Sequence, residues 1–373
     1  MDIDKITELC ADCGNCLHYC PVYNAELTEP NSPRGKVNLV KALYDGTFHP
    51  SDQLEIFTYQ CVLCGSCEYN CTKGVEFTDM MIEFRNRRSK GKNIPILRKI
   101  ILSIYDLNIL KIFVKFLFLI PKAIRKRIKI LPVSGFPALK LKKKIKGKRD
   151  EKFDILLFPG CMINLFYTDI KERIYDLLTI HGFSVVIPDH MKCCGAPYKT
   201  QGWNEKFLKL KKKNKKIFSK FKFKYIVIPC GTGVKTFRKY YDIKDAEVFE
   251  LTEFIYKFIK DAKINRNIIN EGEKITYHDP CHNLKLLNIK DEPRFFMKKF
   301  DKNFVDDNSE LCCGFGGLFS VNFGKTSKKI LKRREDRIEE IGADTVVTSC
   351  PGCYYQLQKN NKQNVKFFID IFE

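Results

Sequence analysis

Short apolar runs alternate with helix-like segments after about residue 150 of this 373-residue chain. The segments 155–158 and 183–187 are apolar almost throughout, and a helical pattern extends between them to about Ile180. Continuous apolar runs between helices are typical of strands buried in a parallel sheet. The pattern therefore predicts α/β structure with parallel sheets for this part of the chain.

The N-terminal part of the chain has a different pattern. Val37, Val40 and Leu43 recur at helical spacing, and Pro33 stands where the first turn of that helix would begin. We therefore expect the first 84 residues to form an α-helical domain.

The second half of the chain contains one cysteine pattern twice, at an offset of 119 or 120 residues. The cysteines are Cys161, Cys193, Cys194 and Cys230 in the first copy, and Cys281, Cys312, Cys313 and Cys350 in the second. Two homologous modules are implied. Because these cysteines follow predicted strands, we expect them at the carboxyl ends of the sheets, where open α/β folds place their sites.

A second cysteine repeat lies in the N-terminal part. The spacing C-x2-C-x2-C-x3-C occurs at Cys10, Cys13, Cys16 and Cys20 and again at Cys61, Cys64, Cys67 and Cys71. In bacterial ferredoxins with this spacing, three thiolates of one run and the last thiolate of the other run share a cubane cluster. The spacing predicts two [4Fe–4S] clusters, one on Cys10, Cys13, Cys16 and Cys71 and the other on Cys61, Cys64, Cys67 and Cys20. Zinc sites, the alternative, would use two C-x2-C pairs and leave the other cysteines without a role.

The two modules differ in their cysteine sets. The second has five, Cys281, Cys312, Cys313, Cys350 and Cys353, and five converging thiolates suit a large or opened iron–sulfur cluster better than a single zinc ion. The first has Gly233 where the fifth cysteine would stand, so Cys161, Cys193, Cys194 and Cys230 suit zinc, a modified cluster or a site that has lost its metal. His278 and His282 flank Cys281 and either tune a cluster ligand or serve as capping and packing residues.

The formal net charge of +22 is concentrated in one connecting segment. Residues 85–149 contain 21 Lys or Arg residues and one acidic residue, Asp106. The apolar run 107–121 inside this segment is too short to span a bilayer and is interrupted by Lys111 and Lys115. A basic amphipathic helix of this kind suits an anionic membrane surface, a partner subunit, or packing on the rest of the chain. Nucleic acid is not expected, because no groove-reading motif accompanies the charge.

We expect four segments: a helical ferredoxin domain at 1–84, a basic connector at 85–150, and two cysteine-rich modules at 151–264 and 265–373. The charged start, Met1 to Lys5, has no secretory signal pattern, so a cytoplasmic location is expected. There the thiols stay reduced and available for metal.

The cysteine pattern as a whole resembles the iron–sulfur subunits of glycolate oxidase and of anaerobic glycerol-3-phosphate dehydrogenase, and the catalytic subunit of heterodisulfide reductase. Four further segments look most like the glycolate oxidase member: Ser32-Pro33-Arg34-Gly35, Phe158-Pro159-Gly160-Cys161, Tyr277-His278-Asp279-Pro280-Cys281-His282, and 342–353 with Pro351-Gly352-Cys353. The resemblance implies a subunit that takes electrons from a flavoprotein dehydrogenase on the inner face of the cell membrane and passes them to quinone, a membrane cytochrome or another acceptor. In the heterodisulfide reductase branch, the resemblance implies direct reduction of a disulfide at the five-cysteine cluster.

The glycine-rich loops do not supply a nucleotide site. Neither 230–233 nor 314–317 has the G-x-G-x-x-G spacing of a dinucleotide fold. We therefore expect no FAD or NAD on this chain and an electron-transfer role beside a flavin-bearing partner. A scaffold that assembles partners without turnover is the remaining alternative.

Overall fold

The computed structural model describes residues 3–49, 51–89, 152–269, 272–360 and 362–373. The interfacial helix predicted within the connector at 85–150 therefore lies outside the described residues. Among the described residues, no helix is both long enough and apolar enough to cross a bilayer.

The N-terminal region (residues 3–89) is built from helices, as the helical spacing of its apolar residues predicts. Ser32 caps the central helix by accepting a hydrogen bond from Gly35 N (2.8 Å), and Pro33 occupies its first turn. Apolar side chains from the first, central and last helices form the core. The elements are α1 (Ile3–Glu8), α2 (Asn15–Tyr19), α3 (Pro21–Glu26), η1 (Glu29–Asn31), α4 (Pro33–Tyr44), α5 (Asp52–Tyr59), α6 (Ser66–Tyr69) and α7 (Phe77–Ser89).

Module 1 (residues 152–264) is a parallel four-stranded sheet with strand order β2-β1-β3-β4. Its strands are β1 (Lys152–Leu157), β2 (Val185–Val186), β3 (Lys222–Ile228) and β4 (Glu247–Glu250). Between and after them lie α11 (Gly160–Phe166), α12 (Thr168–Ile180), α13 (Ala196–Thr200), α14 (Asn204–Phe218), α15 (Gly231–Tyr240) and α16 (Leu251–Phe258).

Module 2 (residues 266–373) repeats this arrangement with strand order β6-β5-β7-β8. Its strands are β5 (Ile275–Tyr277), β6 (Phe304–Val305), β7 (Thr345–Thr348) and β8 (Asn364–Phe367). The other elements are η2 (Arg266–Ile268), α17 (Cys281–Leu286), α18 (Asp291–Phe300), α19 (Leu318–Asn322), α20 (Gly324–Glu340), α21 (Pro351–Leu357), η3 (Gln358–Asn360) and η4 (Phe368–Ile371). The predicted fold class, a helical domain followed by two parallel α/β modules, is confirmed.

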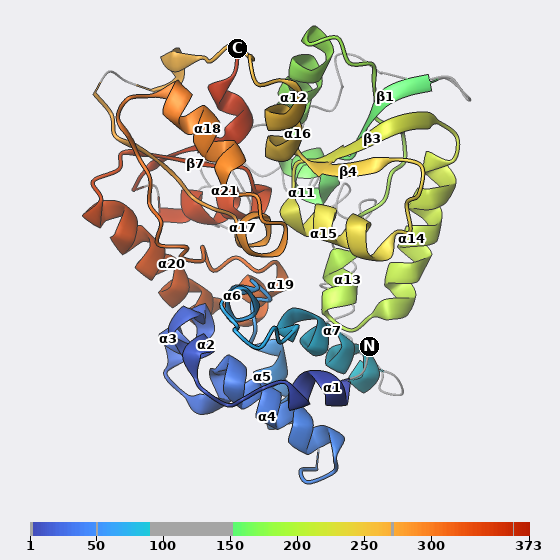
Figure 1. The fold of residues 1–373 in the computed structure, drawn as a ribbon, viewed down its shortest axis with the longest axis vertical. Helices are drawn as coiled ribbons and strands as arrows, with labels where there is room; N and C mark the ends of the chain where they lie inside the picture. Colours follow the sequence, from blue (N-terminus) through green and yellow to red (C-terminus); the bar gives the residue numbers. More distant parts are fainter. Residues whose placement is uncertain (1–2, 50, 90–151, 270–271, 361) are drawn as a thin grey trace, which may run out of the picture.

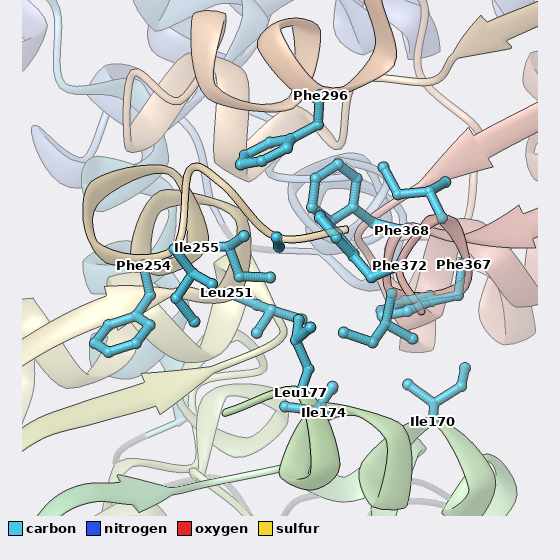
Figure 2. Packing of buried hydrophobic residues seen from close by; sticks show 14 of the residues in the cluster. Ile170, Ile174, Leu177, Leu251, Phe254, Ile255, Phe296, Phe367, Phe368 and Phe372 are labelled. Carbon is cyan, nitrogen blue, oxygen red and sulfur yellow. The ribbon is translucent and has the colours of Figure 1, made fainter. Parts of the chain in front are cut away.

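A shared hydrophobic core joins the two modules. Side chains from α12 and α16 of module 1 pack against Phe296 of α18 and against Phe367, Phe368 and Phe372 near the C-terminus (Figure 2). Most members of this core are less than 5 % exposed, which fixes the two sheets relative to each other. The N-terminal helices lie beneath both modules, with α6 near α17 and α19 and with α7 near α13 (Figure 1).

Candidate metal centre

Three distant parts of the chain surround one cavity of about 200 Å³. Module 1 contributes residues from the segments after β1, β2 and β3, and module 2 contributes residues from the segments after β5, β6 and β7. The N-terminal region contributes residues 61–64 and Arg85. The cysteines that line the cavity are Cys61, Cys64, Cys161, Cys194, Cys230, Cys281, Cys312, Cys313, Cys350 and Cys353. A single site therefore collects thiols that the sequence assigns to three separate groups.

Parallel strands place the module cysteines at this cavity. Cys230 caps α15 directly after β3, and Cys350 caps α21 directly after β7. Cys161 and Cys281 stand in the first turns of the helices that follow β1 and β5. Since the carboxyl ends of parallel strands share one edge of a sheet, each module presents its thiols on one side.

Glycine shapes the loop after the cysteine pair in module 2. Gly314 follows Cys312-Cys313 with φ at +77°, and a Cβ there would lie 2.7 Å from the backbone oxygen of Ser327. Only glycine fits both the left-handed backbone and the close approach to α20. Gly65, in the second C-x2-C run, is similarly constrained, with φ at +80° and the side chain of Leu286 at 2.5 Å from the position of a Cβ.

The second C-x2-C run lies directly against module 2. The thiols of Cys64 and Cys281 lie within hydrogen-bonding reach of each other. His282 connects three parts: its Nε2 lies 2.9 Å from Leu63 O and its Nδ1 lies 2.7 Å from Thr232 Oγ1 in module 1. Burial lowers the pKa of His282 to about 4, so the neutral ring donates to Leu63 O and accepts from Thr232. His282 therefore has an architectural role.

Lys285 is a buried cation at the same junction. Its Nζ donates to Ser66 Oγ (2.7 Å) and to Glu310 O (3.0 Å), and the residue is 9 % exposed. Burial alone would lower its pKa, but the negative charge of Cys281 and Cys64 outweighs burial and raises the pKa of Lys285. The ammonium group therefore stays charged beside the sulfurs of Cys64 and Cys281, and its charge favours their ionised form.

Replacing Lys285 with methionine should make the reduction potentials of the centres on either side of the junction more negative. Reduction adds negative charge, which a nearby buried cation stabilises. Lys285→Arg, which keeps the charge, is the matched control. Potentiometric titration followed by EPR measures both variants, and an unchanged potential in Lys285→Met would contradict this role.

Two further buried cations flank the second C-x2-C run. Lys36 donates to Asn31 O from a side chain that is almost fully buried, and it interacts electrostatically with Cys61, Cys20 and Cys67. Arg85 binds Thr58 O and Thr200 O, which ties α7 to module 1. Burial raises the pKa of Cys61, and the charge of Arg85 offsets part of this rise. Neither cation was identified from the sequence, because nothing in the local pattern marks Lys36 or Arg85 as buried.

One predicted set of cubane ligands, Cys61, Cys64, Cys67 and Cys20, lies together in the N-terminal region. Cys20 lies near Cys61 and Cys64, and Cys67 lies near both of them and near Cys20. Burial raises the pKa of Cys20 to about 12. Cys10 and Cys71 pack against the core of this region, Cys16 lies near Cys10, and Cys13 is exposed. The group with Cys13 therefore faces solvent, and the group with Cys64 faces module 2.

The chemistry of these thiols fits a bound metal. Hydrogen bonds from neighbouring thiols, together with burial, raise the pKa values of Cys64, Cys281 and Cys353 well above the usual range for a thiol. Burial and the charge of neighbouring cysteines do the same for Cys67 and Cys230. So many buried thiols cannot ionise together without cations, and iron or zinc would supply the missing positive charge. The residues present therefore fit iron–sulfur clusters.

The modules differ in how tightly their donors converge. In module 2, donor atoms of His278, Cys313 and Cys353 all lie within 4.8 Å of one another, and the two sulfurs are 3.3 Å apart. No comparable trio of module 1 thiols is found among the described residues. Cys161 lies beside Cys193, while Cys230 interacts at longer range with Cys350, Cys194 and Cys161. The module 1 thiols thus converge less tightly than those of module 2.

Comparison with known proteins agrees with this geometry. A 4Fe-4S dicluster domain model matches residues 6–75, and a cysteine-rich domain model matches residues 155–236 and again 275–358. The chain therefore has the domain arrangement of an iron–sulfur protein. The helical region and the two modules are therefore an iron–sulfur dicluster domain and two cysteine-rich domains.

Two relatives align with nearly the whole chain at low identity, and a third aligns with about half of it. An uncharacterized iron–sulfur protein of Methanocaldococcus jannaschii is 26 % identical over 361 residues, which cover 95 % of this chain and 68 % of the relative. A Bacillus subtilis protein named "Probable glycolate oxidase iron-sulfur subunit" is 25 % identical over 392 residues, covering 94 % of this chain and 88 % of the relative. Lactate utilization protein A of Halalkalibacterium halodurans is 29 % identical over 214 residues, covering 53 % of this chain and 86 % of the relative.

Proposed function

We propose that this chain is the electron-transfer subunit of a flavin-dependent oxidoreductase of the glycolate or glycerol-3-phosphate type. It would hold two [4Fe–4S] clusters in the N-terminal region, on Cys10, Cys13, Cys16 and Cys71 and on Cys61, Cys64, Cys67 and Cys20. A third cluster would be held by Cys281, Cys312, Cys313, Cys350 and Cys353, and module 1 would hold zinc or a modified cluster. Iron–sulfur clusters, when bound, supply one-electron transfer.

The contact between Cys64 and Cys281 carries this proposal. It brings a predicted cubane ligand and a predicted module 2 ligand together, with Lys285 beside both groups. The other predicted cubane set includes the exposed Cys13. The predicted cluster ligands thus extend from the surface inward to module 2. Clusters in such a row would allow stepwise electron transfer.

The chemistry of the clusters and the names of the relatives support a flavoprotein partner. Removing two electrons from an organic substrate usually requires a flavin or nicotinamide, and proteins with one-electron centres accept the electrons afterwards. Two relatives have names that refer to glycolate oxidase and to lactate utilization, which favours a 2-hydroxyacid dehydrogenase as the partner. Quinone or a membrane cytochrome would then be the acceptor.

Anaerobic co-purification and reconstitution test the proposal. The chain, isolated with a flavin dehydrogenase encoded beside it, should transfer electrons from glycolate, lactate or glycerol 3-phosphate to a quinone analogue, and neither protein should do so alone. The visible absorbance of the iron–sulfur clusters should decrease when substrate is added to the two proteins together. Reduction of the flavin by substrate without any reduction of the iron–sulfur clusters would contradict the proposal.

A disulfide reductase is the second candidate. The cavity favours it, since thiols of both modules face a space of about 200 Å³ in which a small disulfide has room near Cys230 and Cys350. Anaerobic protein reduced with dithionite should then be reoxidised by small disulfides and release two thiols for each disulfide. No reoxidation by disulfides, together with reoxidation by quinones, would favour the first candidate.

Membrane attachment through the connector stays a prediction. Deleting residues 94–130 should release the protein from membranes into the supernatant, because a basic amphipathic helix binds anionic lipid through charge and apolar area. Fractionation of cells expressing the full chain and the deletion variant measures this. A deletion variant that still sediments with membranes would exclude this segment as the anchor.

A further inference from the structure

The two modules differ at three equivalent positions around the cysteine pair. His278 N donates to Val347 O (2.8 Å) in module 2, and Phe158 N donates to Val227 O (2.9 Å) in module 1, so the histidine and the phenylalanine occupy the same place in the repeat. By the same offset of 120 residues, Thr348 matches Ile228 and Cys353 matches Gly233. Module 2 has donor side chains at all three places, and module 1 has none.

In module 1, apolar side chains occupy the space around these positions. The Phe158 ring lies 4.9 Å from the ring of Phe237 and 6.2 Å from that of Phe218. A Cβ at Gly233 would lie 2.9 Å from Cγ2 of Ile228, so the isoleucine occupies part of the space that a fifth cysteine would need. Module 1 thus lacks both the fifth thiol and the histidine.

In module 2 the histidine points into the metal-binding group. His278 is 1 % exposed, and among the described residues its Nε2 has no hydrogen-bond partner. The donor atoms of His278, Cys313 and Cys353 lie within 4.8 Å of one another, and all three residues are buried. A buried ring nitrogen without a partner is costly, so its position beside two thiols calls for a bound group.

The surrounding backbone holds this ring in place. Thr348 Oγ1 donates to the backbone oxygen of His278 (3.1 Å), and the next residue, Asp279, forms a buried ion pair with Arg294 (2.7 Å). Both contacts immobilise the loop between β5 and Cys281. The ring is therefore positioned before any metal binds.

We propose that His278 is a metal ligand in module 2, binding through a ring nitrogen beside Cys313 and Cys353. Imidazole replaces thiolate on iron in other iron–sulfur centres and raises their reduction potentials. This inference rests on the proposed function, since it requires an iron–sulfur assembly on the five cysteines. It makes module 2 a mixed nitrogen and sulfur site and leaves module 1 with sulfur ligands alone.

Pulsed EPR on anaerobically reduced protein tests the inference. The signal that belongs to module 2 is identified as the one missing from Cys353→Ala. It should show the strong coupling of a directly bound ¹⁴N nucleus, which changes to ¹⁵N coupling when the cells are fed ¹⁵N-labelled histidine. The coupling should be lost in His278→Phe, which copies module 1, and kept in His49→Phe, which replaces an exposed histidine of the N-terminal region.

The outcomes separate the two proposals. A module 2 signal without strong histidine nitrogen coupling in the wild-type protein would overturn His278 as a ligand and leave the proposed function standing. If module 2 gives no iron–sulfur signal at all, the proposed function itself fails. The labelling experiment uses wild-type protein, so the result does not depend on whether His278→Phe folds.

Discussion

Replacing Cys313 with alanine will remove the module 2 centre and stop electron transfer through the chain, while both cubane sites remain. Cys313 is buried among Cys312, Cys353 and His278, at the centre of the five-cysteine group. Iron should fall from about twelve to about eight per chain, because one four-iron cluster is lost. Substrate-driven reduction of the acceptor by the reconstituted pair should fall to background.

The repeat provides a matched control for this substitution. Cys194→Ala changes the equivalent cysteine of module 1, which is also buried and also lines the cavity. It should alter the metal content of module 1 and leave the module 2 signal unchanged. Iron analysis, EPR and the reconstituted assay distinguish the variants, and an unchanged iron content in Cys313→Ala would show that this cysteine holds no cluster.

Replacing Asp307 with asparagine should destabilise the protein by about 3 kcal/mol, because breaking a buried ion pair leaves an uncompensated charge. The Asp307 side chain is fully buried, pairs with the buried Arg334 of α20, and accepts from Arg337 Nε (3.1 Å). The same carboxylate accepts from Ser309 and so fixes the loop that leads to Cys312. The shift in the midpoint of urea unfolding under anaerobic conditions measures the loss.

The loss of stability caused by Asp307→Asn should become smaller at low pH. Burial alone would raise the pKa of Asp307, but the charge of Arg334 and the hydrogen bonds from Arg334, Ser309 and Arg337 outweigh it and lower the pKa. The charged Asp307 side chain therefore contributes its full stabilisation above a pH of about 4, the pKa of an aspartate in the unfolded chain. This stabilisation disappears as the pH falls through the lower pKa that Asp307 has in the folded protein. The difference in the free energy of unfolding between wild type and Asp307→Asn should thus become smaller below about pH 4.

An exposed ion pair on the same helix is the control. Lys332 and Asp336 of α20 are both more than 40 % exposed, and an exposed pair of this kind contributes little to stability because water and salt screen it. Asp336→Asn should therefore leave the urea midpoint nearly unchanged at every pH. Equal effects of the two substitutions would contradict the role assigned to the buried pair.

Much of the fold was predictable because its signals are local or periodic. The apolar run 155–158 overlaps β1, the pattern ending near Ile180 matches the end of α12, and Pro33 opens α4 as expected. The offset of 119 or 120 residues correctly indicated two modules of the same topology. These features follow from short-range propensities and from the burial of parallel strands.

The meeting of the three parts at one cavity was not predictable in the same way. The contact between Cys64 and Cys281 joins residues far apart in the chain, and no local pattern encodes it. Lys285 was not identified from the sequence, and His282 was expected to tune a cluster ligand or to cap and pack, yet these two residues bind Ser66 and Leu63 of the N-terminal region. Packing between domains depends on whole surfaces, so a single sequence does not reveal which side chains become buried there.

Metal and sulfide analysis of anaerobically purified protein, combined with EPR of the reduced state, tests the central claim most directly. The account predicts about twelve irons per chain, from two cubanes and a module 2 cluster, with further iron or about one zinc in module 1. It also predicts spin coupling between the module 2 centre and its neighbouring cubane, because Cys64 and Cys281 are in contact. About eight irons with no signal beyond two cubanes would contradict the account.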